Sequence, residues 1–178
     1  MRLTTGLVIG LLSICVHAET RHAGAHVHGL NHVQIVLDRT TLQVNYEFPI
    51  AQLQEHDEHK THGHKNDQSP TLLGAEVKDK VAISELIRLP EDAECVEINT
   101  VYLVKNTVAD GKATEESRHQ DVVIEATMKC GQPNKVSSLD FAPAFNKFDD
   151  LEKIEVEGMV RNRPLSDTLS RKRASTSI

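Results

Sequence analysis

The chain has 178 residues, of which 26% are charged and 39% hydrophobic, and its formal net charge is −6 at pH 7. This length is enough for one domain with a buried core. The net negative charge makes nucleic acid and anionic membrane surfaces poor partners.

Residues 1–18 have the features of a cleaved export signal. Arg2 precedes a short apolar run, and small residues end the segment. The run is shorter than the roughly 20 apolar residues that span a bilayer, and no later stretch looks like a membrane span. Ile14 is too bulky for the position before a lipobox cysteine, so we do not expect Cys15 to carry a lipid. We therefore expect a secreted protein whose domain covers residues 19–163.

Four histidines occupy even positions near the expected mature start: His22, His26, His28 and His32. On an extended backbone, His26 and His28 project from the same face and can bind one ion together. Neutral imidazole is the commonest protein ligand for borderline-soft metals such as Zn²⁺. We expect a zinc site here, and the alternative is a flexible polar N-terminus whose histidines hold no metal.

The next stretch predicts a β-hairpin. Residues 32–38 and 41–48 alternate between apolar and polar side chains, and the polar pair Arg39 and Thr40 joins them. Pro49 ends the second strand because proline cannot continue a ladder of hydrogen bonds. One face of this hairpin should be buried and the other solvated.

A second group of histidines lies in an insertion of about residues 52–69: His56, His59, His62 and His64. Histidine-rich tracts of this kind are associated with metal binding, and Glu55, Asp57 and Glu58 add oxygen ligands. A flexible loop loses conformational entropy when it closes round an ion. We therefore expect weaker sites suited to capture and release, against the alternative of a solvated loop with incidental histidines.

The remaining pattern predicts an α+β fold. Helical spacing of apolar residues indicates a helix over 76–89, and strands follow over 96–104 and 122–128 with a long exposed loop between them. Further expected elements are an extended piece at 139–141, a small helix that begins at Pro143, a strand that carries Ile154, Val156 and Val160, and over residues 164–178 an edge segment with a disordered basic tail. This order predicts a single domain with a mainly antiparallel sheet and two helices on one face.

Cys95 and Cys130 are the two cysteines that follow the expected signal. In an oxidising compartment two cysteines most simply form a disulfide. The rival interpretation makes them zinc ligands, but neither lies near a histidine in sequence. We expect the disulfide.

Catalytic patterns are mostly missing from the sequence. His56 and His59 do not form the metalloprotease pattern HExxH, and there is no phosphate loop, nucleophile elbow or dinucleotide fingerprint. We therefore expect a protein that is not an enzyme. The alternative is a small secreted metalloenzyme that uses the pair His26 and His28.

The segment His22-Ala-Gly-Ala-His26-Val-His28-Gly29 resembles the start of the ZrgA-like family of bacterial periplasmic zinc-binding proteins. The similarity continues at Tyr46-Glu-Phe-Pro49, at Leu73-Gly-Ala-Glu76, around both cysteines, and along residues 138–156. Val77 differs from the family, which usually has a histidine after this glutamate.

The resemblance implies a periplasmic protein that supports zinc acquisition or buffering beside an ATP-driven zinc importer or the importer's binding protein. It supports His22, His26 and His28 as ligands, whereas the histidines of residues 56–64 rest on composition. Imidazole sites also bind Cu²⁺ and Ni²⁺, so a copper or nickel protein is the remaining alternative.

Overall fold

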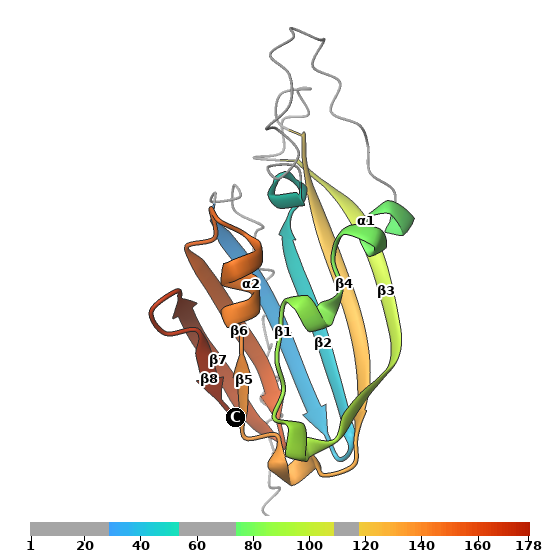
Figure 1. Cartoon of the computed structure of the whole chain (residues 1–178), viewed down its shortest axis with the longest axis vertical. Coiled ribbons are helices and arrows are strands. Elements are labelled where there is room, and N and C mark those ends of the chain that lie inside the picture. Colours follow the sequence, from blue (N-terminus) through green and yellow to red (C-terminus); the bar gives the residue numbers. More distant parts are fainter. Residues whose placement is uncertain (1–28, 54–73, 109–117) are drawn as a thin grey trace, which may run out of the picture.

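A computed structural model describes residues 29–53, 74–108 and 118–178 (Figure 1). The expected signal peptide, Cys15, and most of the histidine-rich insertion lie outside these residues. Among the described residues, no helix is long and apolar enough to cross a membrane.

Six strands form one sheet in the order β3-β4-β2-β1-β6-β7. Neighbouring strands run antiparallel except for the parallel pair β1 and β6. The strands are β1 (Leu30–Asp38), β2 (Thr41–Pro49), β3 (Cys95–Val108), β4 (Arg118–Cys130), β6 (Lys153–Val160) and β7 (Arg163–Ser170). The short helices α1 (Gly74–Lys80) and α2 (Ala142–Lys147) cover the same face, which confirms the predicted α+β class (Figure 1).

The predicted hairpin is confirmed in detail. Asp38 pairs with Thr41, so Arg39 and Thr40 form a two-residue turn, and Arg39 has a φ of 51°. Along β1 the odd-numbered side chains are buried and the even-numbered ones are exposed. This period-two alternation places the even residues, His32 included, on the face opposite the helices, which we call the outer face.

The core lies between the sheet and its helices. Fully buried aromatic side chains come from β2 and from the segment around α2: Tyr46, Phe48, Phe141, Phe145 and Phe148. The parallel pairing of β1 with β6 depends on a close backbone approach at Gly158. A Cβ atom there would lie 1.8 Å from the carbonyl oxygen of Ile35, so only glycine fits.

The helix predicted over 76–89 is shorter than expected. It ends at Lys80, Ala82 is extended, and a 3-10 turn follows at Ile83–Glu85. The backbone of Arg88 then forms two hydrogen bonds with Asp140, which a continuous helix would not permit. The apolar side chains of the segment are buried all the same, because the bent chain follows the face of the sheet.

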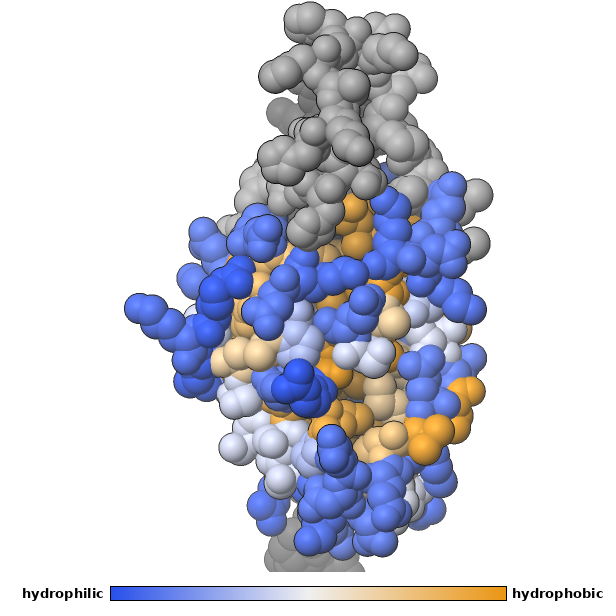
Figure 2. All heavy atoms as spheres, in the orientation of Figure 1, coloured by the Kyte–Doolittle hydropathy of each residue, from blue (hydrophilic) through white to orange (hydrophobic). Residues whose placement is uncertain are grey.

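The strands β3 and β4 are longer than predicted and reach into the expected loop, as far as Val108 and from Arg118. β3 forms an edge of the sheet, and its most exposed apolar side chains are Val96 and Ile98. Figure 2 shows apolar surface at the right of the view, on the side where β3 runs in Figure 1.

The expected disorder of the C-terminal tail is wrong. β8 (Ser175–Ser177) pairs with β5 (Ser138–Asp140), and Thr176 is buried. Arg173 forms two hydrogen bonds with the Asp167 carboxylate, at 3.0 and 2.8 Å. Arg171 donates to the carbonyls of Phe145, Phe148 and Asp149 at the end of α2. The basic residues that suggested a solvated tail therefore attach it to the domain.

Candidate metal-binding end of the sheet

Three histidine-bearing segments meet the sheet at one end. His32 pairs with Glu47, so the start of β1 lies beside the end of β2, and Pro49 pairs with Asp121 near the start of β4. The described chain therefore stops or resumes at Gly29, Leu53 and Arg118 at the same end (Figure 1). We call this the histidine end, because His28 precedes Gly29, the tract begins three residues after Leu53, and His119 follows Arg118.

Gly29 fixes the point where the N-terminal group reaches the sheet. Its φ is +81°, and its carbonyl oxygen accepts hydrogen bonds from the backbone N–H groups of Glu152 and Lys153, at 2.8 and 2.9 Å. A Cβ atom at this position would lie 2.7 Å from the carbonyl oxygen of Asp150. A residue with a side chain would be strained here, so glycine after His28 has a structural cause.

His32 is the one histidine whose side chain the structure describes. It lies on the outer face between Glu47 of β2 and Glu155 of β6, its register partners on the two sides. Its Nδ1 atom lies 3.3 Å from Oε2 of Glu155, and the two side chains are 52% and 45% exposed. The imidazole is therefore held at a carboxylate and remains open to solvent.

Glu47 faces a different partner. Its Oε2 atom lies 3.6 Å from Nζ of Lys105 on β3, so its charge is offset by an ammonium group. The two carboxylates beside His32 are thus unequal, since Glu155 contacts the imidazole and Glu47 forms an ion pair. Neither glutamate was predicted as part of the site. Glu47 lies opposite His32 within the predicted hairpin, whereas the position of Glu155 depends on the parallel pairing of β6 with β1, which joins segments more than a hundred residues apart.

A buried polar pair underlies the histidine end. The Nδ2 amide of Asn31 donates to the Tyr46 hydroxyl at 3.1 Å, and both side chains are fully buried. Burial raises the pKa of Tyr46 far above its usual value, and the hydrogen bond from Asn31 opposes this in small part. The pair ties the start of β1 to β2 directly behind His32.

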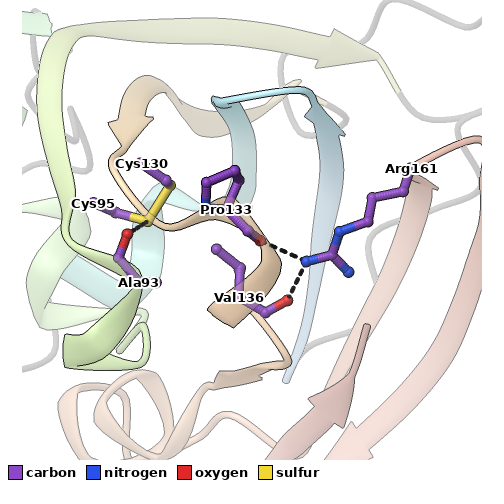
Figure 3. Close-up of a disulfide and its surroundings, with 6 residues drawn as sticks. All are labelled: Ala93, Cys95, Cys130, Pro133, Val136 and Arg161. Atoms are coloured by element: carbon purple, nitrogen blue, oxygen red, sulfur yellow. Dashed lines mark hydrogen bonds between the residues drawn. A yellow bond between two sulfur atoms is a disulfide. The ribbon is translucent and has the colours of Figure 1, made fainter.

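Cys95 and Cys130 are bonded, as the sequence predicted, at the opposite end of the sheet (Figure 3). Arg161, beyond the end of β6, donates to the carbonyls of Pro133 and Val136 at 2.6 and 2.9 Å near this bond. We call this region the disulfide end. Because both sulfurs are in the disulfide, neither cysteine offers a thiolate to a metal.

The other predicted ligands, His22, His26, His28, His56, His59, His62 and His64, lie outside the described residues. Within residues 29–53, 74–108 and 118–178, no group of three or more histidine, cysteine, aspartate or glutamate side chains is placed to hold a metal ion. What the described part provides is an anchor for the N-terminal group at Gly29 and one exposed imidazole at His32.

Comparison with known protein families identifies the chain. A model described as ZrgA family zinc uptake protein matches residues 25–178. The chain belongs to this family. The match covers Cys95 and Cys130, both histidine groups except His22, and the C-terminal strands, including β8, which the sequence did not predict. No curated protein matches the chain.

Membership in the ZrgA family indicates a role connected with zinc. It is a family of zinc uptake proteins, not of enzymes. The matched region runs to residue 178, so it includes the C-terminal tail that the structure packs against the domain.

Proposed function

We propose that the protein binds zinc in the periplasm and supports zinc acquisition or buffering beside an ATP-driven importer or the importer's binding protein. The observation that carries this proposal is that the chain joins the same end of the sheet at Gly29, directly after the N-terminal histidine group, and at Leu53, just before the histidine tract, in a member of a zinc uptake family. In the proposal, metal is bound at this end, away from the disulfide.

The two histidine groups have different parts in this proposal. His26 and His28, with His22, form the tightest site beside His32, because Gly29 anchors their segment to β1 and β6. Less conformational freedom is then lost on binding than in a free peptide. The tract from His56 to His64 supplies weaker ligands that capture and release metal.

Calorimetric zinc titration of the mature protein, produced without a histidine tag, tests the binding step. The imidazole ring must be neutral to bind metal, and an unperturbed histidine side chain titrates at about pH 6.5. We expect zinc affinity to fall steeply between about pH 7.5 and 5.5, because several imidazoles gain protons. Affinity that stays constant over this range would show that histidines are not the ligands.

Metal analysis of the purified protein tests which metal is bound, and a growth assay tests the connection with the importer. We expect bound zinc in protein purified from zinc-replete cells, and slower growth of a deletion strain when a chelator limits zinc. A strain that lacks both this protein and the importer should grow no worse than a strain that lacks the importer alone. Copper or nickel as the bound metal, or normal growth of the deletion strain without zinc, would contradict the uptake role.

A further inference from the structure

The outer face shows an asymmetry around His32 that bears on how the imidazole binds metal. Glu47 of β2 and Glu155 of β6 are the register partners of His32 on the two neighbouring strands. Glu155 approaches the ring at Nδ1, whereas Glu47 is drawn to Lys105. We infer that zinc binds His32 through Nε2 and that Glu155 is a positioning residue that holds the ring for this purpose. This inference rests on the proposed zinc-binding function.

The backbone on both sides of the contact is fixed. His32 lies in β1 between β2 and β6, and Glu155 lies in β6 between β1 and β7, where it pairs with Thr168. Ladders on both sides of each strand leave only the side-chain torsions free. The Asn31–Tyr46 bond behind β1 further restrains the position of His32. The sheet therefore fixes the two backbones, and the side-chain torsions bring Nδ1 to 3.3 Å from the carboxylate.

The Glu155 carboxylate determines which tautomer of the neutral His32 imidazole is favoured. A neutral imidazole has one N–H donor and one nitrogen with a free lone pair, and the partner of one nitrogen sets the state of the other. An ionised carboxylate only accepts hydrogen bonds, so Glu155 favours the proton on Nδ1 and leaves the lone pair on Nε2. Metal-bound histidines commonly donate their second N–H to a carboxylate in this way, and loss of such a partner lowers metal affinity by about 10–100-fold.

A competing arrangement places the ion between Nδ1 and Glu155, with both as ligands. Among the described residues, no third histidine, cysteine or carboxylate is grouped with this pair, so such an ion would have only two ligands from them. Because Nδ1 is the nitrogen that contacts Glu155, Nε2 is the ring nitrogen left for a metal, and the side chain is 52% exposed. The Nε2 arrangement is therefore the one the geometry favours.

Three variants separate these arrangements in zinc titrations of the full mature protein. Glu155→Ala removes the carboxylate, and we expect about 10-fold weaker zinc binding. Glu155→Gln keeps an oxygen that can accept from Nδ1, so most of the affinity should return. Glu47→Ala is the matched control, because it removes the same charge at the same register and should change affinity by less than about 3-fold, the size of a screened surface effect.

Long-range ¹⁵N NMR of the His32 ring adds a measurement that does not need metal. We expect Nδ1–H as the main tautomer without zinc, a shift toward the other tautomer in Glu155→Ala, and zinc on Nε2 when metal is added. Equal losses in Glu155→Ala and Glu47→Ala would overturn the positioning role in favour of general electrostatics. Equal losses in the Ala and Gln variants, or zinc on Nδ1, would overturn it in favour of direct ligation.

The failure of this inference is distinct from the failure of the proposed function. If the wild type binds zinc and His32→Ala binds it equally well, the inference is wrong and the function stands. If the wild type binds no zinc, both are wrong. Thermal unfolding of each variant shows whether the domain is intact.

Discussion

The disulfide end of the sheet is held by the Cys95–Cys130 bond and by the Arg161 guanidinium on two carbonyls, with a two-residue turn between β1 and β2. At the histidine end, by contrast, the sheet adjoins the two histidine groups at Gly29 and Leu53, and the contacts that hold this end include the Gly29 anchor and the Asn31–Tyr46 bond. One end thus supplies stability and the other supplies potential ligands. A change at the disulfide end should alter stability without altering metal affinity.

The largest expected effect on stability is at the disulfide end. The double variant Cys95→Ala and Cys130→Ala frees a loop whose ends are 35 residues apart in sequence. The chain-entropy account of disulfides gives a loss of about 4 kcal/mol in the free energy of unfolding. Urea denaturation measures this loss, and calorimetry should find zinc affinity unchanged in the folded variant. A large loss of zinc affinity would show that the two ends are coupled.

Gly29→Ala should affect both properties, because this residue lies where the N-terminal histidines join the sheet. Its positive φ and the 2.7 Å approach to the Asp150 carbonyl predict a loss of about 1–3 kcal/mol in unfolding free energy. Zinc affinity should also fall. In the control Gly131→Ala, the nearest atom is Oε2 of the Glu94 side chain, which can move aside. Equal losses in the two variants would argue against a special conformation at Gly29.

Tyr46 predicts a smaller effect that depends on pH. Its pKa is raised by burial in the folded protein, so the buried hydroxyl stays neutral when the unfolded chain ionises near pH 10. The contribution of this neutral hydroxyl to the free energy of unfolding is therefore fully present below about pH 10. Above that pH the free energy of unfolding falls by up to about 1.4 kcal/mol per pH unit. Tyr46→Phe should remove this part of the alkaline dependence. Tyr102→Phe, at a half-buried position, should remove less, and the reverse order in denaturation curves would contradict the assignment.

Local patterns predicted much of the fold. The alternation in residues 32–48 gave the hairpin, its turn and its buried face, because period two and a two-residue link are properties of adjacent residues. The disulfide was predicted because two cysteines follow the expected export signal and the expected compartment is oxidising. The parallel pairing of β1 with β6 could not be predicted, because it joins segments far apart and depends on a backbone contact at Gly158.

The predictions of a long helix and of a disordered tail were both wrong because tertiary contacts decided the local structure. The helix over 76–89 was predicted from spacing alone, but the backbone of Arg88 found partners in β5. The tail was predicted to be disordered from its basic residues, but Arg171 and Arg173 bind carbonyls and a carboxylate of the domain. For the site, composition identified the histidines, whereas Glu155 became visible only through the register of β6 against β1.

The most direct test of the account compares zinc titrations of two variants that alter the histidine end in different segments. Replacing His26 and His28 by alanine should abolish the tightest site and leave the fold intact. Deleting residues 55–64 should lower the number of bound ions or the rate of capture and leave a tight site. His119→Ala is the control, with no change expected. If the deletion abolishes tight binding and the double alanine variant keeps it, the principal site is not the one anchored at Gly29.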